Sequence, residues 1–99
     1  MSKTLFVSRH PATIEWAKMK GLSIDTWVEH LDESVLLDDG DHIIGTLPIN
    51  MVEALNAKGV TYSHFSLNLK KKFRGKELTM DELLSCQPKL DSYTVTKIV

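Results

Sequence analysis

One pattern occurs twice in this chain: an apolar strand, a short polar turn, a proline and then helical spacing of apolar residues. The two turns with their prolines are Ser8-Arg9-His10-Pro11 and Gly45-Thr46-Leu47-Pro48. Proline suits the first turn of a helix, because its missing N–H would have no partner there. Strands that lead directly into helices in this way predict an α/β fold with a mainly parallel sheet of about five strands flanked by helices.

The whole chain follows this alternation. Helices are expected from Pro11, at Pro48 and after Thr79, where Glu82 lies three residues on and predicts a capping box. Strands are expected at residues 4–8, 22–30, 42–45, 60–67 and 93–99, with an acidic loop at 32–40 and a basic loop at 70–76. The order is therefore β-α-β-loop-β-α-β-α-β.

The second helix has a predicted start and a predicted apolar face. Thr46 is expected to cap this helix, and Pro48 is expected to occupy its first turn. The residues expected on its apolar face are Ile49, Val52, Ala54 and Leu55.

Length and charge limit the classes of protein. Ninety-nine residues make one small domain, spanning residues 1–99, and a net charge of −1 argues against general binding of long DNA or RNA. The basic run from Lys70 to Lys76 has two open interpretations: a solvated loop, or a loop that attracts a small polyanion. Without a membrane-length apolar run or a signal-peptide pattern, the chain is expected to be cytoplasmic. The single Cys86 is expected to be a buried apolar residue.

The first turn offers chemistry for binding phosphate. Arg9 can clamp a phosphate through two hydrogen bonds, and His10 titrates near neutrality and can move a proton. Ser8 can orient an oxygen atom. The alternative is that Arg9 is an ordinary surface residue and His10 only caps the helix.

Further candidate residues lie on the second turn, the fourth strand and the basic loop. Gly45 can allow a ligand close to the backbone, and Thr46, beside Leu47, can contact phosphate or ribose, although it can also be a simple helix cap. The remaining candidates are His64, Ser66 and Arg74, each with a structural alternative. No ligand-like spacing of histidine, cysteine or carboxylate residues predicts a metal, and no cofactor motif occurs.

Several segments together resemble a small family of type III CRISPR-associated proteins, the Csx-sixteen family. These segments are Phe6-Val7-Ser8-Arg9-His10-Pro11, Ile14-Glu15-Trp16-Ala17, Glu29-His30-Leu31-Asp32, Ile44-Gly45-Thr46-Leu47-Pro48, Tyr62 to Leu69, and Arg74-Gly75-Lys76-Glu77-Leu78. The resemblance implies a Rossmann-like (CARF-like) ligand-binding fold, usually paired as a homodimer. It also implies a ring nuclease that cleaves cyclic oligoadenylate, chiefly cyclic tetra-adenylate, and so switches off type III CRISPR signalling.

The expected reaction needs no metal. The ribose 2′-hydroxyl attacks the adjacent phosphorus and leaves a 2′,3′-cyclic phosphate. We assign charge stabilisation to Arg9, acid or base catalysis to His10, and oxygen contacts to Ser8 and Thr46, with Arg74 closing over the ligand. Two alternatives stay open: a protein that sequesters the same messenger without cleaving it, and a phosphatase that forms a phosphohistidine at His10.

Overall fold

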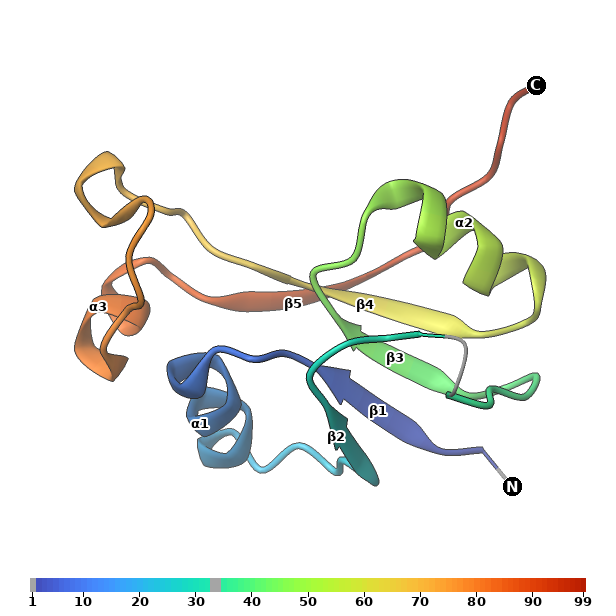
Figure 1. The fold of residues 1–99 in the computed structure, drawn as a ribbon, viewed down its shortest axis with the longest axis horizontal. Coiled ribbons are helices and arrows are strands. Elements are labelled where there is room, and N and C mark those ends of the chain that lie inside the picture. The colour runs from blue at the N-terminus through green and yellow to red at the C-terminus, as the bar shows by residue number, and fades with distance from the viewer. Residues whose placement is uncertain (1, 33–34) are drawn as a thin grey trace.

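The computed structural model describes residues 2–32 and 35–99, and its strands form one five-stranded sheet in the order β2-β1-β3-β4-β5 (Figure 1). The strands are β1 (Thr4–Val7), β2 (Thr26–Val28), β3 (His42–Gly45), β4 (Thr61–Ser66) and β5 (Lys89–Tyr93). The helices are α1 (Pro11–Met19), α2 (Ile49–Ala57), the 3-10 helix η1 (Lys71–Phe73) and α3 (Met80–Ser85). The predicted order of strands and helices is confirmed.

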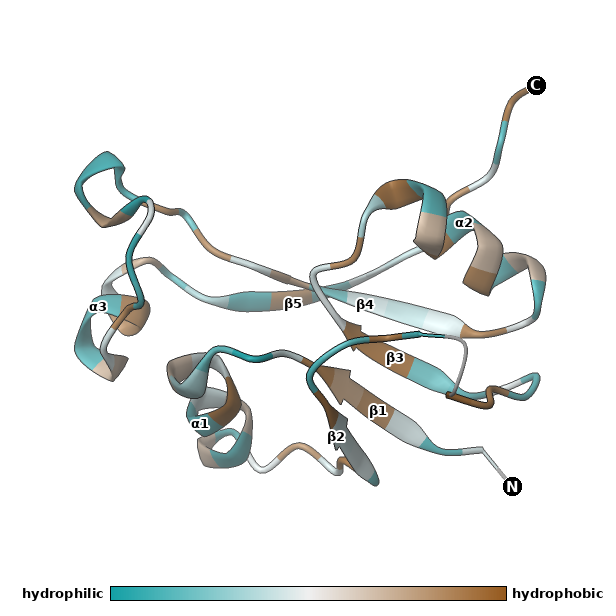
Figure 2. Cartoon of the chain, viewed as in Figure 1, coloured by the Kyte–Doolittle hydropathy of each residue, from teal (hydrophilic) through white to brown (hydrophobic). Residues whose placement is uncertain are grey.

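The neighbouring strands β2, β1, β3 and β4 are parallel to one another, whereas β5 runs antiparallel to β4. The fold is therefore a small α/β domain with a mixed, mostly parallel sheet. Alternate residues of β1 enter different cores: Leu5 packs on the face covered by α2, and Phe6 packs on the face covered by α1 and α3. The brown segments of β1 and β3 in Figure 2 reflect this burial of central strands on both faces.

The two helices that follow β1 and β3 lie on opposite faces of the sheet (Figure 1). Because β1 and β3 are neighbours, the chain leaves their adjacent carboxyl ends in opposite directions. In an open α/β sheet this divergence creates a crevice outside the strand ends, and ligands bind there. The topology thus brings the two polar turns together.

Two predicted strands differ from the observed ones. The strand expected at 22–30 is confined to Thr26–Val28. The strand expected at 93–99 is wrong, because β5 comes earlier, at Lys89–Tyr93, while the tail leaves the sheet after the N–H of Val95 donates to Asn56 Oδ1 at 2.7 Å. The β5 segment is a mostly exposed edge strand, so it lacks the apolar alternation that marks half-buried strands.

The start of α2 also differs from the prediction. Thr46 is not the N-cap; Pro48 holds that position, without a side-chain cap bond. The residue before a proline is disfavoured in the helical conformation, so Leu47 stays outside the helix. Its N–H donates instead to the Tyr62 hydroxyl at 2.9 Å. The predicted apolar face is only half correct: Val52 and Leu55 are buried, whereas Ile49 is 71% exposed and Ala54 is exposed.

Other predicted details are confirmed. The Thr79–Glu82 capping box is present at α3, with the N–H of Glu82 donating to Thr79 Oγ1 at 3.2 Å and the N–H of Thr79 donating to Glu82 Oε1 at 2.9 Å. Cys86 is fully buried. Within the described part of the chain, no helix is long and apolar enough to cross a membrane.

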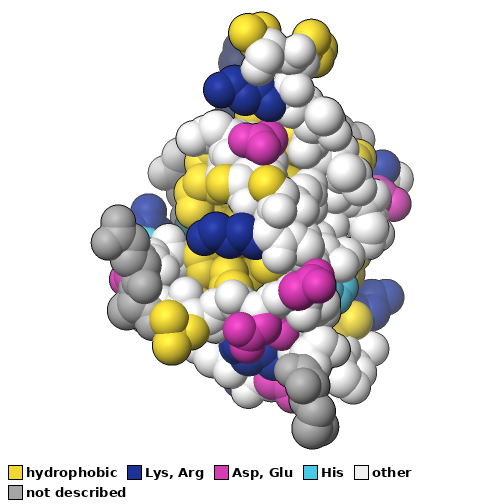
Figure 3. Space-filling view, turned by 90° about the vertical axis from the view of Figure 1, so that its right-hand side faces the viewer, with side chains coloured by type: hydrophobic (Ala, Val, Ile, Leu, Met, Phe, Trp, Pro, Cys, Tyr) yellow, Lys and Arg dark blue, Asp and Glu magenta, His cyan; other side chains and the backbone are white. Residues whose placement is uncertain are grey.

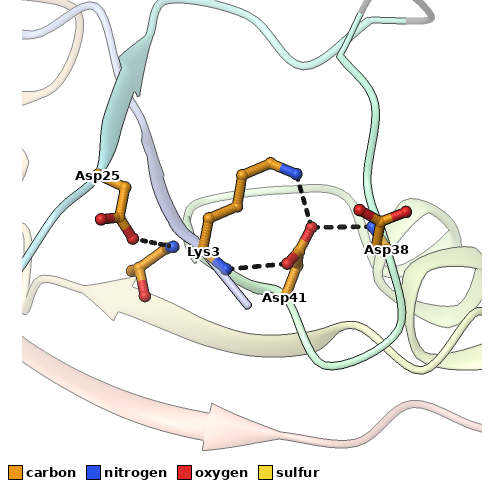
Figure 4. A network of polar contacts seen from close by, with 5 residues as sticks. Lys3, Asp25, Asp38 and Asp41 are labelled. Carbon is orange, nitrogen blue, oxygen red and sulfur yellow. Dashed lines mark hydrogen bonds and ion pairs between the residues drawn. The ribbon is translucent and has the colours of Figure 1, made fainter. Parts of the chain in front are cut away.

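A buried carboxylate fixes the amino ends of the central strands (Figure 4). Asp41 is fully buried, so this part of the acidic stretch is not solvated. Its oxygens accept hydrogen bonds from the Lys3 N–H, the Lys3 ammonium and the Asp38 N–H at 2.8 to 2.9 Å. These donors, the Asp38 N–H foremost, lower the pKa of Asp41 from 3.8 to about 2.

We expect Asp41→Asn to destabilise the fold, because an amide cannot accept all three hydrogen bonds with a full negative charge. The Tm at neutral pH should fall by on the order of 10 °C. A lowered folded-state pKa stabilises above the unfolded value and loses that effect as the group is protonated. The Tm difference from wild type should therefore shrink as the pH falls from 3.8 toward about 2.

Thermal unfolding followed by circular dichroism across this pH range measures the difference. Asp91→Asn is the matched control, since Asp91 is exposed and its ion pair with Lys89 is long, at 3.8 Å. An Asp41→Asn protein with wild-type Tm at neutral pH would show that Asp41 does not anchor the sheet.

Candidate functional site

The candidate site lies at the carboxyl ends of β1 and β3, where both polar turns begin. Gly45 is required there for close packing of the strands: a Cβ at this position would lie 3.0 Å from the Val7 carbonyl oxygen and 3.3 Å from the Val7 Cβ. A larger residue would push the second turn away from the first. Close packing of β3 against β1 is therefore sufficient to explain a glycine at position 45, without any contact to a ligand.

Two adjoining hollows share the residues Val7, Ser8, His10 and Thr46, and we call them the inner and outer hollows. The inner hollow has a volume of about 290 Å³, with an apolar floor that includes Phe65 and Leu67 and a polar rim that includes Thr13. The outer hollow, about 360 Å³, adds Arg9, Glu29 and His30. Together they place hydroxyl, imidazole and guanidinium groups around one crevice.

A third, smaller hollow of about 180 Å³ continues from the inner one toward the loop before α3. It shares His10, Thr13, Leu67 and Leu69 with the inner hollow and adds Glu77. The three hollows therefore follow one edge of the molecule, with His10 lining all of them. This central position makes His10 the side chain best placed to meet a ligand that lies along the edge.

The imidazole of His10 is paired with a carboxylate. Its Nδ1 lies 3.0 Å from Glu77 Oε1 and 3.2 Å from Glu77 Oε2, although the two residues are 67 positions apart in the chain. An ionised carboxylate only accepts hydrogen bonds, so Nδ1 carries the proton in this contact. In the neutral ring the other nitrogen, Nε2, is then free to accept a proton.

The first turn is held by backbone contacts. The N–H of Ser8 donates to the Val28 carbonyl at 2.9 Å, and the N–H of His10 donates to Ser8 Oγ at 3.2 Å. His10 is the N-cap of α1 and makes no side-chain cap bond, so its ring is not committed to the helix. Arg9 is exposed at the rim of the outer hollow. The turn thus presents Arg9 and His10 from a fixed backbone.

The second turn is held by a buried tyrosine. The Tyr62 hydroxyl donates to the Gly45 carbonyl at 3.0 Å, accepts from the Leu47 N–H at 2.9 Å, and lies 2.6 Å from His64 Nδ1. Since its single proton is used on Gly45, His64 Nδ1 must be the donor in the third contact. Burial raises the pKa of Tyr62, so the hydroxyl stays protonated and keeps this geometry.

We expect Tyr62→Phe to loosen the second turn, because it leaves the Gly45 carbonyl and the Leu47 N–H without their partner. The free energy of unfolding should fall by about 1–3 kcal/mol, the usual cost of an unsatisfied buried polar group. Chemical denaturation measures this change, with the half-exposed Tyr93→Phe as control. Equal stability of both variants would contradict the role given to the Tyr62 hydroxyl.

The structure brings most of the predicted site residues together, but not all. Ser8, Arg9, His10, Gly45, Thr46 and Leu47 line the inner or outer hollow. His64 instead supports the second turn from the α2 side, and Ser66 pairs with Lys89 in the sheet. Arg74 is exposed on the basic loop and lines none of the hollows described between residues 2–32 and 35–99.

Several polar residues that line the hollows were not among the predicted site residues, among them Thr13, Glu29, His30 and Glu77. Glu29 and His30 directly follow β2, whose carboxyl end lies at the same edge as that of β1 because the two strands are parallel. A polar pair after a predicted parallel strand is the signal that indicates them. Nothing local in the sequence indicates Glu77, whose contact with His10 depends on the tertiary fold.

A different part of the surface carries exposed hydrophobic side chains. Figure 3 shows them on the face turned to the right in Figure 1, together with Lys or Arg and Asp or Glu side chains. A hollow of about 470 Å³ between residues 31–32 and 35–37 on one side and α2 on the other is lined mostly by hydrophobic side chains, among them Leu36, Met51 and Leu55. Groups able to bind phosphate are concentrated instead along the carboxyl edge.

The fold and this edge define a small α/β protein with a polar crevice at the ends of its central strands. Residues 5–96 match the family described as "Putative CRISPR-associated protein (Cas_VVA1548)", and the chain belongs to this family of CRISPR-associated proteins. No curated protein and no solved structure matches the chain. The expected association with CRISPR systems is confirmed.

Proposed function

We propose that this protein is a ring nuclease that binds and cleaves cyclic oligoadenylate, with cyclic tetra-adenylate as the favoured substrate. The observation that carries the proposal is the convergence of Ser8, Arg9, His10 and Thr46 on adjoining hollows at the ends of two neighbouring parallel strands. Membership of a CRISPR-associated family supports a substrate made in CRISPR defence. The resemblance to the Csx-sixteen family supports this particular messenger.

The strand order supports a Rossmann-like interpretation of the sheet. The order 2-1-3-4 with helices on both faces is that of doubly wound nucleotide-binding sheets, in which the ligand lies between the ends of strands 1 and 3. The antiparallel β5 is a departure at the sheet edge and lies away from this crevice. Nucleotide binding at the β1–β3 ends is therefore consistent with the topology.

The lining of the hollows suits a nucleotide with a charged backbone and flat bases. The apolar floor of the inner hollow, including Phe65 and Leu67, favours a base, and the hydroxyl-bearing rim with Arg9 nearby favours phosphate. The crevice on one chain covers only part of a four-nucleotide ring. We infer that a second copy of the chain provides the other wall, because a two-fold dimer presents the same turns to both halves of a nearly symmetric ring.

The proposed reaction is an attack of the ribose on its own phosphate. A bond forms between the 2′-oxygen and phosphorus, and the bond from phosphorus to the 5′-oxygen breaks. His10 Nε2 takes the hydroxyl proton, while the leaving 5′-oxygen gains a proton from water. Arg9 stabilises the extra charge on the phosphoryl oxygens, and Ser8 with Thr46 holds the phosphate or ribose in line.

A multiple-turnover assay tests the proposal. The protein is incubated with an excess of cyclic tetra-adenylate and EDTA, and the products are separated by chromatography. We expect linear products with a 2′,3′-cyclic phosphate end. Only intact ring after many binding equivalents would contradict cleavage and favour sequestration, and release of inorganic phosphate from simple monoesters would favour a phosphohistidine mechanism at His10.

A further inference from the structure

We propose that Glu77 is a positioning residue for His10: it fixes the proton on Nδ1 and so keeps Nε2 free to act as the base. This inference rests on the proposed function, since it assigns a role within the same site. It goes beyond that function because it adds to the site a residue from the loop before α3. That loop is far along the chain from the ends of β1 and β3.

The contact between the two side chains is close and double. His10 Nδ1 lies 3.0 Å and 3.2 Å from the two carboxylate oxygens of Glu77. Both side chains remain about half exposed, with relative exposures of 56% and 57%, so the pair can meet a ligand in the adjoining hollows. A contact of this strength in water contributes little to stability, which leaves orientation as its main effect.

Glu77 is held in place by the structure around it. Its neighbour Lys76 donates to Glu82 Oε2 at 2.7 Å, and Glu82 is itself part of the capping box that starts α3. Phe73, earlier in the same loop, is buried and lines the smallest hollow together with Glu77. The backbone is therefore anchored before Glu77 by Phe73 and Lys76, and after it by the capping box of α3.

The pairing decides which ring nitrogen can react. With the carboxylate on Nδ1, the neutral imidazole is held as the Nδ1–H form, and its Nε2 lone pair can take the proton of a ribose hydroxyl. A carboxylate that orients a histidine in this way also stabilises the imidazolium formed when the proton arrives. Without the carboxylate, the ring can turn and populate the other neutral form, whose Nε2 cannot accept a proton.

Other charged and titratable groups lie around His10. Lys76 lines the smallest hollow with it, and Arg9, Glu29 and His30 line the outer hollow. Among the contacts of the described residues, the His10 ring has its hydrogen bonds to Glu77 and none to these four neighbours. The neighbours shape the local potential, whereas Glu77 sets the tautomer.

Two readouts test the proposal, and the first needs no substrate. Long-range proton–nitrogen NMR spectra at a pH where the His10 ring is neutral report which nitrogen carries the proton; His10→Ala assigns the signals. We expect the Nδ1–H form in the wild type and in Glu77→Asp, and a mixture of forms in Glu77→Gln. The exposed Glu15→Gln on α1 removes the same charge elsewhere and should match the wild type.

The second readout is turnover of cyclic tetra-adenylate. Glu77→Gln should lower kcat by about 10-fold to 100-fold, the usual cost of losing a carboxylate that orients a histidine, with KM changed by less than about threefold. Glu77→Asp should recover a large part of kcat. A wild-type His10 in the Nε2–H form, or a Glu77→Gln enzyme with unchanged kcat, would overturn the proposal.

The two readouts separate the inference from the function on which it rests. If the wild-type protein does not cleave cyclic tetra-adenylate, the proposed function fails, and the role of Glu77 in that reaction fails with it. The NMR result then still decides whether Glu77 orients the ring. If cleavage occurs and the tautomer does not depend on Glu77, the nuclease assignment stands and the positioning role is refuted.

Discussion

Arg9→Ala will lower the turnover of cyclic tetra-adenylate by on the order of 100-fold while leaving the fold intact. The reason is electrostatic: the guanidinium at the rim of the outer hollow is the strongest donor available to the phosphoryl oxygens as charge develops on them. Loss of one such donor from a preorganised site typically costs two to three orders of magnitude in kcat. Single-turnover and steady-state rates, measured on the same preparation, give the loss.

The control for this variant is Lys20→Ala. Lys20 follows α1 at the end far from Arg9, so its loss removes one positive charge without touching the hollows. Arg74→Ala is a further comparison, and it should affect turnover less than Arg9→Ala because Arg74 lines none of the described hollows. If Arg9→Ala stays within about twofold of the wild-type rate, Arg9 does not stabilise the transition state.

His10→Ala will have a second large effect, a fall in kcat of on the order of 100-fold to 1000-fold, because the proposed base is lost. The His10 ring lines all three hollows at the edge, whereas His30 lines only the outer one. Rates across the pH range measure the effect, and the variant should lose the rise in rate that accompanies deprotonation of the base.

Stability and binding separate this loss from misfolding. His10 is half exposed and makes no side-chain cap bond to α1, so the Tm of His10→Ala should stay within about 3 °C of the wild type. Binding of the ring should persist, since Arg9, Ser8 and Thr46 remain. A folded His10→Ala protein that cleaves at the wild-type rate would remove the acid–base role from His10.

The sequence was sufficient to predict the order of strands and helices. Pro11, Thr79 and Glu82 carry local helix-start signals that hold in the structure, because such signals act within one turn of chain. Ser8 and Thr46 follow strands that turn out to be parallel neighbours. The alternation of strands and helices predicts that both turns lie at carboxyl ends of strands, whereas the structure supplies the strand order that makes them neighbours.

The parts that could not be predicted depend on tertiary contacts. The hydroxyl of Tyr62, from a neighbouring strand, accepts from the Leu47 N–H and so holds the turn before α2. His64, on the same strand, contacts this hydroxyl and so supports the turn. The partnership of Glu77 with His10 joins residues far apart in the chain, and no local pattern encodes it.

The most direct test of the account asks where the ring binds. Cyclic tetra-deoxyadenylate lacks the attacking 2′-hydroxyl, so it can be titrated into the isotope-labelled protein without being cleaved. The account predicts amide shift changes centred on Ser8, Arg9, His10 and Thr46, with Lys3 at the amino edge unchanged. Saturable binding whose shifts centre on the amino edge or on the apolar hollow beside α2, with residues 8–10 unaffected, would contradict it.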